Sequence, residues 1–282
     1  MLSIKPLHPV FGAEVTAFVW RPESPVEQIS ELLALFESHS VLVLRGMTLT
    51  DAEQIQLSKH FGPLEKTKTG TLGTGSELVI LTNLDANGQL VPETHKQWLE
   101  GLGNQLWHTD SSFKPVPALA SLLSARQIPA QGGQTQFAST RYAYETLPPG
   151  LRNAVKEKVG THDYAYSRSL ISDTLMTEAE RIELPPVKHP LVRKHPVTGK
   201  RGIYVGSHLA SIEDMPLDQS RALIDELQAH ATRDEAIYTH HWRTGDLVIW
   251  DNRFVLHRGR PYPSEQARTM VRTTVAGALP VE

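Results

Sequence analysis

The second half of the chain consists of short apolar segments separated by turn-forming residues, and this pattern constrains the fold more than any other feature. From Leu119 onward, β-branched and aromatic residues concentrate in segments of four to nine residues that glycine, proline, asparagine or aspartate bounds. The predicted strands are 119–126, 134–138, 190–195, 201–206, 237–242, 246–250, 254–258 and 268–276. Strands of this number and spacing predict a closed or double-sheet barrel, so we expect a mainly β, jelly-roll-like fold with peripheral helices.

Helices and two further strands are expected around that barrel. Apolar residues that recur every three or four positions, with start signals such as Thr50-Asp51, predict helices at 25–39, 51–60, 139–147, 149–158 and 216–231. Short apolar runs predict strands at 40–45 and 77–83. Residues 84–104 are polar and predict a long loop. Because no repeat or linker interrupts the chain, we expect one domain over residues 1–282, with residues 62–104 as an active-site loop region.

Composition and charge exclude several classes of protein. The net charge is -3 and the sequence pI is about 6.5, which does not suit an obligate nucleic-acid partner. No apolar run approaches the roughly 20 residues that cross a bilayer, and the first residues lack a basic and apolar leader, so we expect a cytoplasmic protein without membrane contact. The chain has no cysteine, so any metal must be bound by histidine, aspartate or glutamate.

One histidine–aspartate pair and one distant histidine are candidate metal ligands. In the segment Leu106–Asp110, extended backbone would place His108 and Asp110 on the same face, because side chains two residues apart point the same way. His257 lies in an apolar stretch near the C-terminus, and a barrel can bring the two segments together. Two imidazoles and one carboxylate leave three octahedral positions free, an arrangement suited to non-haem Fe(II) oxygenases. A solvated H-x-D loop and a packed histidine are the alternative interpretation.

Two arginines follow the second histidine. Arg268 and Arg272 lie 11 and 15 residues beyond His257. A turn between His257 and Arg268 is marked by Pro261, Pro263 and Ser264. The turn predicts that 254–258 and 268–276 are neighbouring antiparallel strands, with both arginines on one face of the second strand. Guanidinium groups there would bind anions in bidentate fashion. The alternative is a solvated basic strand.

Four longer motifs resemble a known family. They are WHTDSSF (107–113), PAQGGQTQFAS (129–139), GDLVIWDNRFVLHRG (245–259) and RTMVRTTVAG (268–277). Over Leu7 to Gly277 the chain resembles the taurine / 2,4-dichlorophenoxyacetate dioxygenase family of Fe(II)- and 2-oxoglutarate-dependent oxygenases. NQLWHTDSSF, LLSAR (122–126) and HATRDEAIYTHHW (230–242) resemble the phenoxyacetate branch more closely. The resemblance implies a double-stranded β-helix and a homo-oligomer.

The resemblance also implies roles for individual residues. His108, Asp110 and His257 would bind and activate the iron, Thr135 would donate its hydroxyl to 2-oxoglutarate, and Arg268 would pair with the distal carboxylate of that cosubstrate. Substrate-pocket positions in the family match Arg272, Asn104, His208 and His195. Lys66 and Lys68 either add positive charge to a loop or are simply solvated, and Asp251-Asn252 needs no role beyond a turn. Gln89 departs from the lysine that phenoxyacetate enzymes tend to carry.

The implied reaction consumes 2-oxoglutarate and O2 at Fe(II) and hydroxylates a small anionic substrate. Oxidative decarboxylation gives succinate and CO2, and an aryloxyalkanoate would be cleaved at its ether to a phenol and an oxo acid. A sulfonate such as taurine, or an alkyl sulfate ester, is the alternative substrate. Alternatives to a dioxygenase are a zinc hydrolase with the same ligands and a non-catalytic anion-binding barrel.

Overall fold

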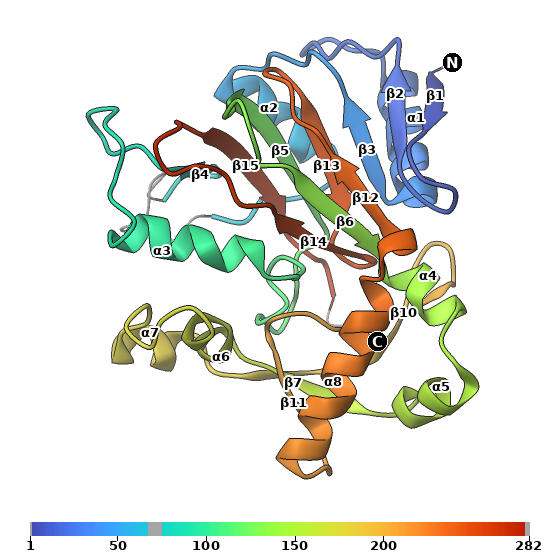
Figure 1. Ribbon diagram of the computed structural model, residues 1–282. Coiled ribbons are helices and arrows are strands. Elements are labelled where there is room, and N and C mark those ends of the chain that lie inside the picture. The colour runs from blue at the N-terminus through green and yellow to red at the C-terminus, as the bar shows by residue number, and fades with distance from the viewer. Residues whose placement is uncertain (1, 67–74, 280–282) are drawn as a thin grey trace.

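A seven-stranded sheet is the largest element of the computed structural model, which describes residues 2–66 and 75–279 (Figure 1). Its strands follow the order β1-β2-β3-β13-β5-β15-β4, and every pair except β2–β3 is antiparallel. The bounds are β1 (Ser3–Pro6), β2 (Ala13–Thr16), β3 (Val41–Leu44), β4 (Val79–Thr82), β5 (Ala120–Gln127), β13 (Leu247–Asp251) and β15 (Thr269–Val275).

The other strands of the described residues form three smaller sheets. The first has the order β12-β6-β14, the second β11-β7-β8, and the third pairs β10 with β9. Their bounds are β6 (Thr135–Ser139), β7 (Val159–His162), β8 (Val187–Pro190), β9 (Val192–Lys194), β10 (Arg201–Ile203), β11 (Leu209–Ile212), β12 (Ile237–His240) and β14 (Val255–Gly259). The β12-β6-β14 sheet faces the large sheet, because Phe137 and Val255 share one buried cluster with Leu123, Trp250 and Met270.

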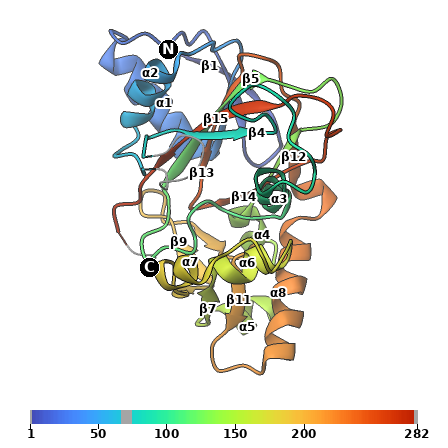
Figure 2. The same cartoon turned by 90° about the vertical axis from the view of Figure 1, so that its left-hand side faces the viewer.

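Most of the helices lie at two ends of the molecule, with α3 and α4 between them (Figures 1 and 2). Their bounds are α1 (Val26–His39), α2 (Asp51–Lys59), α3 (Lys96–Leu102), α4 (Thr140–Glu145), α5 (Pro149–Val155), α6 (Tyr164–Ser169), α7 (Glu178–Glu183) and α8 (Leu217–Ala231), with 3-10 turns η1 (Gly103–Gln105) and η2 (Asp234–Ala236). In both views α1 and α2 lie at the end opposite α5–α8 (Figures 1 and 2). No helix in residues 2–66 and 75–279 is both long and apolar enough to span a membrane.

The central strands are apolar on both faces because both faces are covered. In β3, Leu42 and Leu44 pack against α1 and α2, whereas Val41 and Val43 point to the smaller sheet. Side chains in a strand alternate between the two faces, so this arrangement requires a continuous apolar run. The same alternation in β15 turns Met270 into the inner core. Arg272 therefore points inward as well, toward the face where the candidate ligands lie.

The structure confirms most predicted elements and corrects two expectations. Residues 84–104 are not one loop, because they contain α3 and η1. The predicted strands 254–258 and 268–276 are not neighbours: β14 pairs with β6, while β15 pairs with β4 and β5. The strand order does not close into a ring within the described residues, so the barrel takes the form of facing sheets. The sequence analysis also missed the strands and helices between 159 and 190.

Truncation of the core between the large sheet and its helices should destabilise the fold strongly. Leu122 is fully buried against α1 and α2, and Leu122→Ala should lower the free energy of unfolding by roughly 2–5 kcal/mol, because it leaves a cavity. Leu217, which is 63% exposed, is the matched control, and Leu217→Ala should change the free energy of unfolding by less than about 0.5 kcal/mol. Urea denaturation measures both, and equal losses would contradict this packing.

Candidate metal and anion site

Three buried side chains, His108, Asp110 and His257, form the centre of the candidate site. Their potential ligand atoms all lie within 4.8 Å of one another. A single antiparallel bridge joins the two histidine backbones: His108 N donates to His257 O at 3.0 Å, and His257 N donates to His108 O at 2.8 Å. Asp110 follows His108 by two residues, so its carboxylate turns back to the same point, 3.7 Å from His257 Nε2.

The donor set fits a divalent metal. His108 Nδ1 donates to Leu106 O at 2.7 Å, which leaves the lone pair of Nε2 for a metal. Burial lowers the pKa of His108 and of His257, so both rings are neutral at ordinary pH, as metal ligands must be. Burial opposes ionisation of Asp110, but the Arg272 guanidinium beside it holds the pKa of that carboxyl well below its usual range. Two neutral imidazoles and one carboxylate suit Fe(II) with sites left for other ligands.

Asp110 is held by side chains from three separate strands or their ends. Ser121 Oγ of β5 donates to Asp110 Oδ2 at 2.7 Å, and Arg272 Nη1 of β15 donates to Asp110 Oδ1 at 2.6 Å. Asn252, just after β13, accepts from Asp110 N at 3.2 Å and from Trp250 Nε1 at 2.9 Å. The Asn252 amide also donates to Ser121 Oγ at 2.9 Å. Asn252 therefore does more than form the turn predicted for it.

The backbone leaves the ligand segment through a left-handed residue. Ser111 has a φ of 57°, a conformation that costs a non-glycine residue roughly 1–2 kcal/mol. Its hydroxyl donates to Glu65 Oε2 at 2.9 Å, and the same oxygen accepts from Lys114 Nζ at 2.6 Å. These contacts compensate the unfavourable backbone and tie the ligand segment to the 62–66 part of the predicted loop region.

Thr135 and Arg268 form a second, polar part of the site. Thr135 is buried, and its hydroxyl accepts from Trp242 Nε1 at 3.0 Å. The Arg268 guanidinium lies over the Tyr262 ring and donates to Gly133 O at 3.4 Å, while its Nε is buried without a hydrogen-bond partner. No carboxylate in residues 2–66 and 75–279 pairs with it. An arginine that has a buried Nε without a hydrogen-bond partner and no carboxylate beside it suits an incoming anion.

The structure places the four residues that were predicted to bind substrate in different surroundings. Arg272 is turned to Asp110, so its role as a substrate partner stays a prediction. Asn104, in η1, lies against β14: a side-chain carbon added at Gly259 would come within 3.6 Å of its carbonyl oxygen. His208 is near the triad, with its ring centre 6.3 Å from that of His108. The role of His195 at the substrate pocket stays a prediction, and the contacts of its ring nitrogens in this structure are to protein groups.

His195 is buried and enclosed by protein groups. Its Nε2 lies 3.3 Å from Asp251 Oδ2 and 3.2 Å from Glu37 Oε2, and Arg253 pairs with both carboxylates. Its Nδ1 accepts from the backbone nitrogens of residues 197 and 198. Both ring nitrogens are thus used by protein groups.

Lys66 and Gln89 are peripheral to the candidate site. Lys66 is exposed, and Lys68 lies outside the described residues. Gln89 is exposed in a turn where its backbone donates to Asp85 Oδ1 at 2.8 Å. Its difference from the lysine of phenoxyacetate enzymes therefore falls on the surface.

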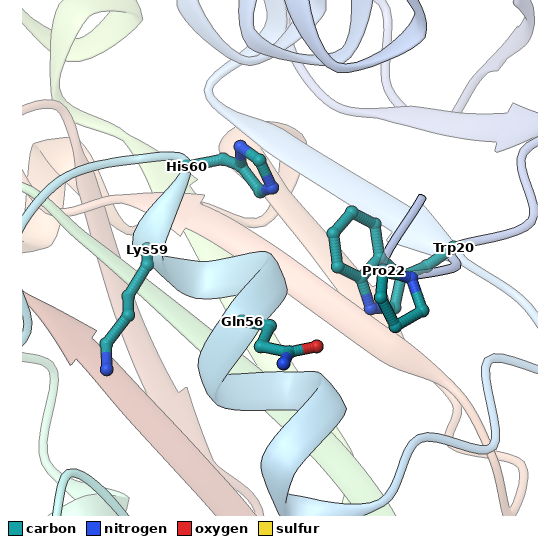
Figure 3. Close-up of a pocket in the computed structure, with 5 residues that line it drawn as sticks. All are labelled: Trp20, Pro22, Gln56, Lys59 and His60. Carbon is teal, nitrogen blue, oxygen red and sulfur yellow. The ribbon is translucent and has the colours of Figure 1, made fainter. Parts of the chain in front are cut away.

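A separate surface pocket lies on the other side of the large sheet (Figure 3). It has a volume of about 320 Å³, and its lining consists of Trp20, Pro22, Gln56, Lys59 and His60. The α2 helix that forms one wall contacts the outward face of β15, where Ser58 and Thr273 hydroxyls lie 2.6 Å apart. Since Arg272 and Asp110 are on the inward face, this pocket is not part of the candidate site.

Comparisons with known proteins agree with this geometry. The profile of the taurine catabolism dioxygenase TauD, TfdA family matches residues 3–274. An alpha-ketoglutarate-dependent 2,4-dichlorophenoxyacetate dioxygenase from Cupriavidus pinatubonensis is 38% identical, over 95% of this chain and 96% of its own. An (S)-phenoxypropionate/alpha-ketoglutarate-dioxygenase from Delftia acidovorans is 31% identical, over 98% and 95% respectively. The crystal structure of AAD-2 with Mn(II) and N-oxalylglycine superposes with a TM-score of 0.93 at 35% identity, covering 100% of this chain and 99% of AAD-2.

Removal of the Asn252 amide should loosen the metal site without unfolding the protein. Asn252→Ala deletes the hydrogen bonds that position Asp110 and Ser121, and loss of such supporting contacts weakens metal binding by roughly 10- to 100-fold. Titration with Mn(II), followed by electron paramagnetic resonance, measures the change. The exposed Asn87→Ala variant should bind as wild type does. Wild-type affinity in Asn252→Ala would show that Asp110 does not depend on this amide.

Proposed function

The chain belongs to the taurine catabolism dioxygenase TauD, TfdA family, and we propose that it hydroxylates an aryloxyalkanoic acid or a similar small carboxylate. Membership makes it an oxidoreductase that depends on Fe(II) and 2-oxoglutarate. The observation that supports the proposal most directly is the buried group of two imidazoles and one carboxylate beside two inward-facing arginines. A zinc hydrolase would leave Arg268 and Thr135 without a role, and an anion-binding barrel without turnover would leave the buried triad without one.

His108, Asp110 and His257 would hold the metal. Iron bound there supplies O2 activation coupled to decarboxylation of 2-oxoglutarate, which yields succinate, CO2 and one hydroxylated C–H bond. The role of the protein is to position the ligands. The bridge between the two histidine backbones sets the separation of the histidines, and Ser121, Asn252 and Arg272 fix the position of the Asp110 carboxylate. Groups that are positioned before reaction need no reorganisation during it.

Arg268 and Thr135 would bind 2-oxoglutarate. The guanidinium would receive the distal carboxylate, and the Thr135 hydroxyl, which accepts from Trp242, still has its own proton to donate. N-oxalylglycine, bound in the AAD-2 crystal, is a structural analogue of 2-oxoglutarate, and the close superposition supports a similar site here.

An aryloxyalkanoate fits the chemistry next to the triad. Phe113, Tyr164 and His208 form an aromatic group with ring centres 4.5–5.8 Å apart, suited to an aryl ring. Hydroxylation of the carbon that bears the ether oxygen gives a hemiacetal, which collapses to a phenol and an oxo acid. The names of the relatives, 38% and 31% identical, support this substrate class.

The fold and the surroundings of the site enter the proposal as follows. We assign the facing sheets to the double-stranded β-helix, in one domain, and assign the active-site loop region to residues 62–104, of which 67–74 lie outside the described residues. The contact between η1 and β14 supports the latter. A homo-oligomer and a cytoplasmic location remain predictions from the sequence.

A panel of small anions tests the substrate class. With Fe(II), ascorbate and 2-oxoglutarate, 2,4-dichlorophenoxyacetate or a phenoxypropionate should give phenol in step with succinate. Taurine and an alkyl sulfate should release little succinate above the rate without substrate. Sulfite or sulfate formed faster than phenol would replace the proposal with the alternative, a sulfonate or sulfate ester oxygenase.

The cosubstrate assignment predicts an ordered loss of affinity. Truncation of one partner of a desolvated charge pair costs roughly 2–5 kcal/mol, so Arg268→Ala should weaken 2-oxoglutarate binding by about 30- to several thousand-fold. Thr135→Val removes one hydroxyl and should cost roughly 1–3 kcal/mol. Calorimetric titration of the Mn(II)-loaded protein measures both, with the exposed Arg260→Ala as the matched control. If Thr135→Val were the more damaging change, the distal carboxylate would not lie on Arg268.

A further inference from the structure

A third arginine near the triad, Arg168, is buried without an ionic partner. Only 8% of its surface is exposed, and its Nε has no hydrogen-bond partner. Within residues 2–66 and 75–279 no carboxylate pairs with it, in contrast to Arg253, which pairs with Asp251 and Glu37. A guanidinium cannot lose its charge near neutral pH, so burial without a counter-ion is unfavourable until an anion arrives.

The surroundings of Arg168 hold its guanidinium at one place. One side faces the Tyr164 ring of the same helix, with the central carbon 4.9 Å from the ring centre. Another side lies against η1: a side-chain carbon added at Gly103 would be 2.3 Å from Nη1 and 2.6 Å from Nη2. Glycine at 103 is therefore what allows the guanidinium to lie against this turn, next to Asn104.

Contacts lead from this arginine directly to the triad. Ser167, its neighbour in α6, has its hydroxyl 2.8 Å from His208 Nδ1, and the His208 ring lies 6.3 Å from the His108 ring. The Arg168 charge therefore acts on the substrate side of the site, beside the aromatic group Phe113, Tyr164 and His208.

We propose that Arg168 binds the carboxylate of the substrate and so makes the enzyme specific for anionic aryl compounds. The inference rests on the proposed function and deepens it. With the carboxylate on Arg168 and the aryl ring against Phe113 and Tyr164, the carbon between them would lie toward His108. Geometry of this kind presents one C–H group to the metal.

The other two inward arginines are less suited to this role. Arg272 already donates to Asp110 at 2.6 Å, and Arg268 lies with Gly133, Tyr262 and the Thr135 segment. Arg168 alone of the three sits on the aromatic side of the triad. It also comes from the peripheral helix α6 rather than from a strand that supports the metal ligands.

The test compares a charged ligand with its neutral analogue. Binding of 2,4-dichlorophenoxyacetate and of its amide is titrated by calorimetry on the full chain with Mn(II) and N-oxalylglycine. Wild type should prefer the acid, and Arg168→Gln should reduce affinity for the acid by roughly 30-fold or more while changing that for the amide little. Arg168→Lys should keep part of the preference. Gly103→Ala, which displaces the guanidinium but keeps its charge, should lose an intermediate amount.

Controls separate this effect from damage to the protein. Arg221 of α8 stacks on Tyr166, which lies in the same helix as Arg168, with the central guanidinium carbon 3.8 Å from the ring centre. Arg221→Gln should therefore retain the wild-type preference for the acid. Affinity for N-oxalylglycine should be unchanged in Arg168→Gln, and circular dichroism should give the wild-type melting temperature. Phenol release, measured separately, tests the proposed function, since an enzyme that binds the acid without cleaving it would fail that test alone.

Each outcome of these titrations either supports or overturns the proposed role of Arg168. Preference for the acid in wild type that disappears in Arg168→Gln and persists in Arg221→Gln supports the inference. Equal affinity of wild type for acid and amide overturns it, and so does a preference that survives Arg168→Gln. Loss of the preference only in Arg272→Gln would place the anion on Arg272 and would overturn it equally.

Discussion

The ionised carboxylate of Asp110 is the interaction on which the rest of the site depends. A buried charge is tolerated only when partners compensate its desolvation, and here the partners come from different parts of the chain. Arg272 lies on β15, Ser121 on β5 and Asn252 beyond β13. The register of the large sheet sets all three, because Ser121 pairs with Trp250 and Thr274, and Arg272 pairs with Leu123. A shift of one residue in β15 would turn Arg272 to the outer face, and Asp110 would lose its counter-ion.

Three arginines around one group of ligands create an excess of positive charge at the inner face of the sheet. Arg272 balances Asp110, whereas Arg268 and Arg168 have no carboxylate partner in the described chain. The two free guanidinium groups lie in different surroundings, one with Gly133 and Tyr262, the other with Gly103 and Tyr164. Such a site suits two separate anions better than one. This agrees with the proposed reaction, in which a 2-oxo acid and an anionic substrate are oxidised together.

Sequence reasoning identified the candidate ligands and Arg272, but not Ser121 and Asn252, which also hold Asp110. His108, Asp110 and His257 carry a recognisable pattern of residue type and spacing, and the central strands carry the continuous apolar runs that a sheet covered on both faces requires. Arg168 and Asn252 carry no such pattern: Asn252 resembles a turn residue, and Arg168 lies between 159 and 190, where short elements were missed altogether. Their importance comes from contacts across the sheets, which local sequence does not encode. The incorrect pairing of 254–258 with 268–276 has the same origin, since the turn between them predicts a hairpin while the sheets separate them.

The division of labour between strands and peripheral elements has a consequence for specificity. The predicted metal ligands and their supports lie on or directly beside strands whose register the two cores fix, so substitutions there would disturb the fold and the chemistry together. Arg168, Tyr164 and Gly103 lie instead on α6 and η1, short elements that pack beside the site and contribute nothing to the large sheet. Changes in these residues could alter which anion is bound while the triad stays intact. A family with this arrangement can acquire different substrates on one catalytic frame, because functional residues on loops and short helices vary more freely than those of the scaffold.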